Sequence, residues 1–595
     1  MVLLADVHPS VNDPGRLARQ LEDLTQAGVL AQDDGSESVY RFTHGLIREA
    51  AVGLCTTDTA RQIHRRAAEW IEQTHVDLSG WFSVLAHHWT GAGIAAKAIR
   101  YEAAAAERAL ASGAYSEAVT GFRQALDLYE GNPELATRLE AATWHMRLGE
   151  ARVFQQGEDE RQAREDLVRG LELIGEAPPR VVPYPVATAV RATEQVRNHW
   201  IGRRPARSPE KVERYRLAAR AYEQLVEVYF LADEDVASLY ASLQALNLAQ
   251  KAGAPAELAR GFATVGAVIG LIPQPKLADR YLSRAEEAAA TTQDLRAVMW
   301  VALVRGFYYA GVGRWQVAEE CSARGRDLAA ELGDRRRLED GLAALMVEQW
   351  FQGRLVEGEA FADEIHHLAQ RRRARRSQAY AAQGRAYVHV EMGDIDRAMA
   401  AIEDLERLGY GLSEDDEPSS SRPDDQALAS DTLALRSLMH FRSGRLDQAV
   451  TDARRLVRRM QGVRPFNFSA FMAYNAAAEV MVMAAVRQPA LAIGDQELKR
   501  AIKLSEAYAR IFPVGRSRPL LWRGMLQARR GRTESALAAI REAAAAARSL
   551  GMRLDEARAL YELSHLGSEG WQEAEAITSA ARARGVAATH GAAAL

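Results

Sequence analysis

Cysteine and long apolar runs are scarce in this 595-residue sequence. The two cysteines, Cys55 and Cys321, lie far apart and cannot form a disulfide framework, which favours a reducing compartment. Residues 1–16 lack the basic and apolar regions of a signal peptide. The most apolar stretch, Tyr474 to Val486, contains Glu479 and is too short to cross a bilayer. We therefore expect a soluble, cytoplasmic protein.

Signatures of catalysis and cofactor binding are also missing. No Gly-Lys pair occurs, so the phosphate-binding loop Gly-x-x-x-x-Gly-Lys-Ser/Thr is absent. Neither His-Glu-x-x-His nor Cys-x-x-Cys occurs. The pairs His87-His88 and His366-His367 are expected on helices, where adjacent side chains point about 100° apart, so we interpret them as packing residues. The sequence predicts no enzyme, no cofactor and no metal site.

A short phrase recurs along the chain: Gly, a polar or small residue, an apolar residue, two variable positions, then Ala. It occurs at Gly113, Gly313, Gly393, Gly444 and Gly531, and a weaker copy begins at Gly353. Recurrence about every 40 residues indicates stacked helical hairpins, which usually bind partners rather than catalyse reactions. The phrase predicts an all-α fold, a tetratricopeptide-like α-solenoid with a period of about 40 residues.

The small residue of the phrase is regularly spaced in the middle of the chain, at Ala237, Ala278, Ala318, Gly358 and Ala398. The next spacing, to Ala449, is longer because an acidic, Ser- and Pro-rich insertion intervenes. The gap before Ala536 predicts one degenerate repeat near Ala490. We divide the chain into a partial winged helix (1–58), connecting helices (59–92), first hairpins (93–175), a Pro- and Arg-rich hinge (176–209), a main solenoid (210–586) with the insertion (413–425), and a disordered tail (587–595).

The N-terminal segment has a different pattern. Residues 16–30 have the leucine spacing of an amphipathic helix, Gln32 to Gly35 is a turn signal, and Val39 to Phe42 is typical of a short strand. A helix followed by a β-hairpin is typical of the second half of a winged helix. Thr43 is expected to cap a helix from His44 to about Cys55, and Thr59-x-x-Gln62 to cap the next.

DNA binding by this winged helix is disfavoured. The net charge is −4, and Glu22, Asp23, Asp33 and Asp34 would face the phosphates. We expect a protein-packing role for the segment instead.

Three motifs in this region carry a family resemblance. The run Tyr40-Arg41-Phe42-Thr43-His44-Gly45-Leu46-Ile47-Arg48-Glu49-Ala50-Ala51 is followed by Ile63-His64-Arg65-Arg66-Ala67-Ala68 and Leu85-Ala86-His87-His88-Trp89. They resemble the junction in bacterial signal-transduction ATPases of the STAND group, where an ATPase module and a winged helix lead into tetratricopeptide-like repeats. The series is most similar to members fused to class III adenylate or guanylate cyclase domains.

The resemblance covers residues 16–130. It implies that Phe42, His44 and Arg48 lie at an interdomain junction, and that the chain is the downstream portion of a longer protein or a split partner of one.

Two arginine runs are candidate partner-binding residues. Equivalent positions of a solenoid stack, so both runs should lie on one edge as a basic stripe; they comprise Arg335, Arg336 and Arg337, then Arg371, Arg372, Arg373, Arg375 and Arg376. The alternatives are a solvated face, or neutralisation by the acidic loop 414–417. An acidic peptide or a nucleotide phosphate would suit a free stripe. We interpret the aromatic group Phe307, Tyr308, Tyr309 and Trp315 as hairpin core, but one of the two adjacent tyrosines should face away from it toward the groove.

We expect a non-enzymatic sensor arm that binds a protein or peptide partner through its superhelix. It would signal to an ATPase or cyclase module in the same or another polypeptide. The alternatives are the regulatory portion of a cyclase-linked ATP-binding protein and a winged-helix transcriptional regulator.

Overall fold

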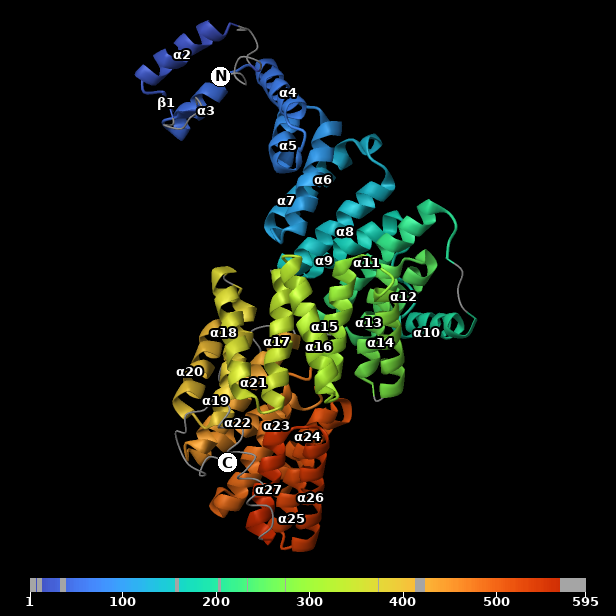
Figure 1. Cartoon of the computed structure of the whole chain (residues 1–595), viewed down its shortest axis with the longest axis vertical. Helices are drawn as coiled ribbons and strands as arrows, with labels where there is room; N and C mark the ends of the chain where they lie inside the picture. The colour runs from blue at the N-terminus through green and yellow to red at the C-terminus, as the bar shows by residue number, and fades with distance from the viewer. Residues whose placement is uncertain are drawn as a thin grey trace. The chain divides into compact units, whose positions relative to one another are not determined.

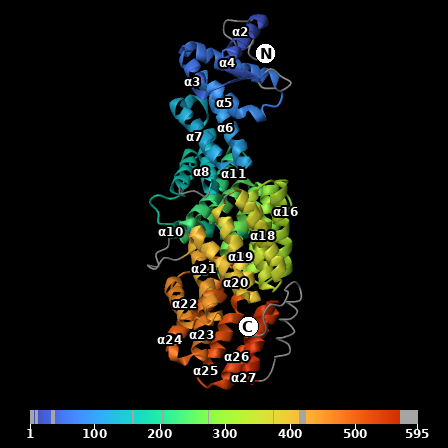
Figure 2. The ribbon, with the colours of Figure 1, turned by 90° about the vertical axis from the view of Figure 1, so that its left-hand side faces the viewer.

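The computed structural model describes residues 7, 13–32, 39–155, 160–201, 205–232, 234–272, 274–372, 374–411 and 423–567. These residues form α-helices apart from one two-stranded sheet, which confirms the all-α, tetratricopeptide-like solenoid (Figures 1 and 2). The chain divides into two compact units, Met1–Val181 and Val182–Leu595, and the boundary falls inside the predicted hinge.

The first unit contains α2 (Pro14–Gln26), β1 (Leu30–Gln32), β2 (Tyr40–Phe42), α3 (Gly45–Gly53), α4 (Thr57–Thr74), η1 (Ser79–Trp81), α5 (Phe82–Gly91), α6 (Ala95–Ala111), α7 (Tyr115–Gly131), η2 (Pro133–Leu135), α8 (Arg138–Gln155) and α9 (Glu160–Leu173).

The second unit begins with α10 (Tyr184–Ile201), α11 (Pro209–Leu231), α12 (Asp235–Ala252), α13 (Pro255–Gly270), α14 (Pro275–Ala289), α15 (Leu295–Gly311), α16 (Trp315–Glu331), α17 (Arg335–Phe351), α18 (Leu355–Arg372), α19 (Arg375–Met392), α20 (Ile395–Leu405) and η3 (Glu406–Tyr410). It continues with α21 (Pro423–Arg442), α22 (Leu446–Met460), α23 (Phe471–Arg487), η4 (Pro489–Leu491), α24 (Asp495–Ile511), η5 (Pro513–Gly515), α25 (Ser517–Arg529), α26 (Thr533–Ser549) and α27 (Arg553–Gly567).

The recurring glycine forms the turn inside each hairpin. Gly113, Gly313, Gly353, Gly393, Gly444 and Gly531 all have φ between 73° and 77°, the left-handed conformation that glycine adopts without a steric penalty. The amide after each glycine bonds back to the helix that is ending, as in Arg314 N to the Tyr309 carbonyl at 2.9 Å and Asp394 N to the His389 carbonyl at 3.0 Å. This helix-ending turn explains the first half of the phrase.

The small residue of the phrase lies where the second helix of a hairpin meets the first. Ala278, Ala318, Ala398, Ala449 and Ala536 are each the fourth residue of their helix and are fully buried. A larger side chain there would separate the helices, because protein interiors are close-packed. The register of the phrase is therefore set by helix packing.

A helical hairpin lies around Ala490, where the spacing predicted a degenerate repeat. It consists of α23 and α24, and the fourth residue of α24 is the buried Leu498. Ala490 lies in the short η4 turn. Leucine in place of alanine at this position hides the repeat from the sequence pattern.

The N-terminal segment differs from prediction in its caps. α2 ends at Gln26, and Leu30 pairs with Phe42 in the antiparallel hairpin. The Thr43 hydroxyl donates to the Gly28 carbonyl at 2.6 Å rather than capping α3. The cap of α4 is Thr56, whose hydroxyl accepts from the Thr59 amide at 3.2 Å. The predicted capping residues were wrong because these hydroxyls find nearer partners, while the order of helix and hairpin is as predicted.

The predicted hinge is not an irregular linker, because α10 occupies much of it. This helix packs on α12 through buried amides: Gln195 donates to the Asn247 side chain at 2.7 Å and Asn198 to the Gln250 side chain at 2.7 Å. The prolines signalled only its flanks. The tail 587–595 and residues 412–422 of the insertion lie outside the described residues.

The second unit folds back on itself (Figure 1). The Trp315 indole donates to the Leu550 carbonyl at 2.5 Å, and Gly353 packs on Leu554. Arg558 contacts Glu391, 167 residues earlier in the chain, at 3.0 Å. Phe351 and Phe471 lie in one buried cluster that runs through this region. Because middle helices of the array contact its last helices, this unit has a core that neighbouring repeats alone would not provide.

Gly113→Ala should lower the stability of α7 by about 1 kcal/mol, because alanine is strained at a φ of 77°. Gly131→Ala is the matched control, since Gly131 ends the same helix, also has open space around it and has no positive φ. It should be neutral or slightly stabilising. Hydrogen exchange of α7 peptides in the full chain measures both effects, and equal effects would contradict the turn argument.

Candidate functional site

Two arginines of the first run, Arg336 and Arg337, form ion pairs with carboxylates of the same chain. Arg336 forms an ion pair with Glu227 of α11, and Arg337 bonds Asp340 at 2.9 Å and lies 4.6 Å from the centre of the Trp300 ring. The side chains of Arg336 and Arg337 are only 15% and 16% exposed. Arg336 and Arg337 therefore do not form a free basic edge, because their guanidinium groups pair with nearby carboxylates.

The second run is divided between two helix ends. Arg371 is exposed near the C-terminus of α18, where the helix dipole favours a cation, and Arg372 ends that helix. Arg373 lies outside the described residues. Arg375 begins α19, donates to the Leu408 carbonyl and lies over Tyr410, and Arg376 contacts Asp425 at 3.4 Å.

Glu227 is where the two runs meet. Burial alone would raise the pKa of Glu227, but the guanidinium groups of Arg336, Arg337 and Arg376 more than offset it, so the pKa lies below its usual range. Members of both arginine runs therefore lie near one another, as expected for stacked repeats. Their positive charges interact with the partly buried carboxylate of Glu227. Partner binding by the exposed Arg335, Arg371 and Arg375 stays a prediction.

The tyrosine pair does not line an open groove. Tyr308 and Tyr309 are both buried, at 9% and 4% exposure, so the expectation that one of them faces outward was wrong. α15 is covered by neighbouring helices on both sides, and the Arg314 guanidinium lies over the Tyr309 ring. Phe307 points outward instead, and its ring is 4.6 Å from that of Phe468.

The chain covers this aromatic surface with its own segment between α22 and α23. Phe466 packs on Phe230 at 5.3 Å between ring centres, and Phe468 also approaches Phe351. The Tyr387 hydroxyl donates to the Ser469 carbonyl at 2.8 Å. Any peptide bound to the ends of α11, α15 and α17 would have to displace this segment.

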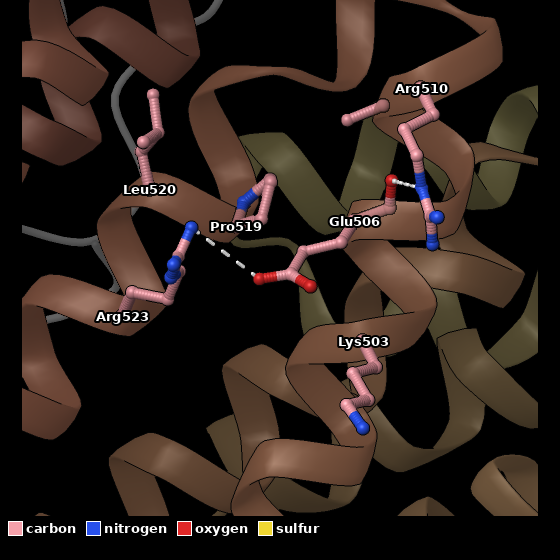
Figure 3. A pocket seen from close by; sticks show the side chains of 7 residues that line it. Lys503, Glu506, Arg510, Pro519, Leu520 and Arg523 are labelled. Carbon is pink, nitrogen blue, oxygen red and sulfur yellow. Dashed lines mark hydrogen bonds and ion pairs between the residues drawn. The ribbon is translucent and has the colours of Figure 1, made fainter.

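A hollow of about 670 Å³ lies between α24 and α25 (Figure 3). Its lining consists of Lys503, Glu506, Ala509, Arg510, Pro519, Leu520 and Arg523. Glu506 contacts Arg523 at 3.5 Å, and the Arg510 side chain donates to the Glu506 carbonyl at 3.2 Å. The lining is mainly basic, and it has no serine, cysteine or histidine.

The residues that the resemblance assigns to a junction lie on the surface. Phe42, His44 and Arg48 are all exposed. His44 precedes the first residue of α3 but forms no side-chain capping bond. No residue of α3 is fully buried, and Leu46 on this helix is 79% exposed. Within the described residues, α3 thus presents apolar side chains that no other element covers.

Three histidines from two helices meet in the first unit. His87 and His88 lie on α5, as predicted, and His64 of α4 approaches both, with ring centres 5.3 Å and 5.1 Å away. The Nδ1 atoms of His64 and His88 are 3.0 Å apart. Burial, with the neighbouring imidazoles, lowers the pKa of His88 to about 4, and the pKa of His64 is also lowered, chiefly by burial.

The sequence pattern did not predict this cluster. The adjacent pair His87 and His88 was visible in the sequence, but the third member, His64, lies on the preceding helix. By contrast, His366 and His367 form a pair whose ring centres are 6.1 Å apart, and the group of three is the only metal-ligand cluster found among the described residues.

Comparisons with known proteins concern the fold alone. The chain matches no protein-family model and no curated protein. Among solved structures it is similar to a STAND protein with a tetratricopeptide repeat sensor from Pyrococcus horikoshii, with 13% identity, a TM-score of 0.34, and coverage of 81% of this chain and 57% of that one. The chain therefore spans little more than half the length of that protein.

Two further structures are similar over most of their length. Yeast Tom70 has 11% identity and a TM-score of 0.32, with 96% of this chain and 98% of that chain covered. The structure of Naa15/Naa10 bound to HypK-THB has 13% identity and a TM-score of 0.24, with 87% and 96% covered. In the part of the chain that the structure describes, no helix is long and apolar enough to cross a membrane.

Proposed function

We propose that this chain is a non-enzymatic interaction arm of a bacterial signal-transduction ATPase. Its N-terminal segment would dock on a nucleotide-binding module, in the same polypeptide or a separate one, and its solenoid would bind a protein partner. Three observations support the proposal: the helical-repeat fold, the motifs between Tyr40 and Trp89, and the uncovered apolar surface of α3. A module fused to an adenylate or guanylate cyclase would be one form of the same arrangement.

The main support for the proposal is the set of exposed apolar side chains on α3 and on the residues that flank it. Leu46, Val52 and Leu54 are 79%, 64% and 87% exposed, and Phe42 at the preceding strand is 42% exposed. Burial of each large apolar side chain contributes about 1.5–3 kcal/mol, so a surface of this kind favours a protein contact. Because no residue of α3 is fully buried among the described residues, a partner would account for its exposed apolar side chains.

DNA binding receives no support from the same segment. On α2 the exposed cations Arg16 and Arg19 are balanced by the exposed anions Glu22 and Asp23. A surface with equal numbers of positive and negative groups has little attraction for phosphates. Asp33 and Asp34 lie outside the described residues. The transcription-regulator alternative is therefore the weaker one.

Affinity capture from the native cell extract tests the proposal. The wild-type chain should retain a P-loop ATPase or a cyclase, identified by mass spectrometry. The double variant Leu46→Asp/Leu54→Asp should retain at least about tenfold less, because two charges in an apolar contact weaken it by more than about 1.4 kcal/mol.

Val76→Asp is the matched control, since Val76 is fully exposed but belongs to the turn after α4. It should leave retention unchanged. Equal retention by the double variant would reject the α3 surface, and retention of no nucleotide-binding protein by the wild type would reject docking on a module in a separate polypeptide.

A further inference from the structure

We propose that His64, His87 and His88 form a binding site for one divalent transition-metal ion of the zinc class. The inference is independent of the proposed function, because it rests only on the geometry of α4 and α5. Every member offers an imidazole nitrogen, and these nitrogen atoms all lie within 4.8 Å of one another.

The distances suit metal coordination. Two ligands at the usual Zn–N length in a tetrahedral site are separated by about 3.3 Å. The Nδ1 atoms of His64 and His88 are already 3.0 Å apart. His87 is exposed, so its ring can turn toward the other two without displacing packed neighbours. Three imidazoles would leave a fourth position for water or an outside ligand, as in many three-ligand zinc sites.

The choice of metal follows from the ligand type. Imidazole nitrogen suits zinc, copper and nickel, whereas calcium and magnesium prefer oxygen ligands. The cluster of three contains no carboxylate. Metal binding requires neutral imidazoles, so binding should weaken as the pH falls.

Two features hold the helices at the distance that the site needs. A Cβ atom on Gly91 would lie 2.7 Å from Cγ and Nδ1 of His64, so only glycine at this position lets α5 approach the imidazole. Two turns along α4, Glu72 accepts hydrogen bonds from Trp89 at 3.1 Å and Tyr101 at 2.8 Å. The three rings therefore project from a packed scaffold rather than from mobile surface chains.

The consequence of such a site is mechanical. A metal ion would join α4, which follows the exposed N-terminal segment, to α5, which precedes the first hairpin. Binding would restrain the relative movement of these two helices. The site could thus make the connection between the segment and the repeats dependent on metal.

Isothermal titration of the full chain with Zn²⁺ in metal-free buffer tests the site. All variants carry Cys55→Ser, because the exposed Cys55 thiol could also bind zinc. We expect one Zn²⁺ per chain with micromolar or tighter affinity. His64→Gln, His87→Gln and His88→Gln should each weaken binding at least about tenfold, because each removes one ligand of a three-ligand site.

The double variant His366→Gln/His367→Gln is the matched control. It removes an equivalent adjacent pair on α18 and should bind Zn²⁺ as tightly as the parent. Co²⁺ gives a second readout, since its tetrahedral complex with the parent should absorb visible light and each cluster variant should lose the band. If a buried member proves necessary for folding, the exposed His87→Gln variant decides alone. Absence of Zn²⁺ binding, or equal affinity in His87→Gln, would overturn the proposal.

Discussion

Replacing Arg518 with methionine is expected to destabilise the second unit by about 3–5 kcal/mol, because it removes the buried cation that bonds two buried carboxylates. The Arg518 side chain is 3% exposed and bonds Glu479 at 2.7 Å and Asp555 at 2.9 Å. Its planar guanidinium also lies 5.2 Å from the Phe471 ring centre. One side chain thereby joins α23, α25 and α27.

The charged groups around Arg518 explain why its removal should lower the stability of the second unit. Burial alone would raise the pKa of Glu479, but the guanidinium groups of Arg558, Arg518 and Arg442 hold it below its usual value. Removal of Arg518 takes away one of these three cations. Asp555 would keep the Ser517 hydroxyl, which donates at 2.6 Å, and the Arg558 guanidinium at 3.2 Å.

Arg523→Met is the control for this experiment. Arg523 lies on the same helix, but its side chain is 60% exposed and its ion pair with Glu506 spans 3.5 Å. An exposed pair contributes between about 0 and 1 kcal/mol, so this variant should resemble the parent. Hydrogen exchange of α23 and α25 peptides in urea measures both variants in the full chain. Equal stability of Arg518→Met and Arg523→Met would contradict the assigned role.

The second large effect is expected from Glu348 and pH. Burial raises the pKa of the Glu348 carboxyl to about 8, and a hydrogen bond from the Ser322 hydroxyl at 2.7 Å opposes the rise only in part. The other carboxyl oxygen has no hydrogen-bond partner. The carboxyl is therefore protonated in the folded protein at neutral pH, whereas in the unfolded chain it ionises near 4.5.

The sign of the pH effect follows directly. Between pH 4.5 and 8 the folded state holds a proton that the unfolded state has lost, so stability falls as pH rises through this window. The slope approaches about 1.4 kcal/mol per pH unit, and it ends above the folded-state pKa. Burial also raises the pKa of Asp431 and Glu223, each to about 7, so the interval from pH 7 to 8.5 reports mainly Glu348.

Glu348→Gln keeps the shape of the side chain and removes its charge. At pH 8.5 the variant should be more stable than the parent by roughly 2–4 kcal/mol, and its stability should fall less between pH 7 and 8.5. Glu320→Gln, a nearby exposed substitution, should leave the pH profile of the parent unchanged. Hydrogen exchange of α17 peptides at the two pH values gives the comparison. A Glu348→Gln profile parallel to that of the parent would refute the buried neutral carboxyl.

Features set by neighbouring residues were predictable. The Gly-x-apolar-x-x-Ala phrase predicted both the hairpin turns and the buried fourth residue of α7, α16, α20, α22 and α26, because a left-handed turn and a close helix contact depend on residues a few positions apart. The repeat of α23 and α24 lies near Ala490, as the spacing predicted, although Leu498 replaces the small residue. The sequence pattern missed α10, since nearby prolines concealed a helix held by buried amides.

For the arginine runs and the tyrosine pair, the sequence indicated roughly where the residues lie but not which residues surround them. Both arginine runs do approach one location, as stacked repeats require, but Glu227 on α11 neutralises members of each. Tyr308 and Tyr309 are buried, and the surface beside them is covered by Phe468 from a distant segment. None of these partners is a sequence neighbour of the group that it meets.

The sequence by itself determined the repeat and its turns, because local backbone conformation and helix periodicity are encoded within a few residues. Only the tertiary structure decided that His64 joins His87 and His88, that Arg518 joins three helices, and that Glu391 meets Arg558. These contacts depend on how far each hairpin rotates relative to the next. Small rotations accumulate along a solenoid, so residues more than a hundred positions apart are brought together by the summed packing of every repeat between them.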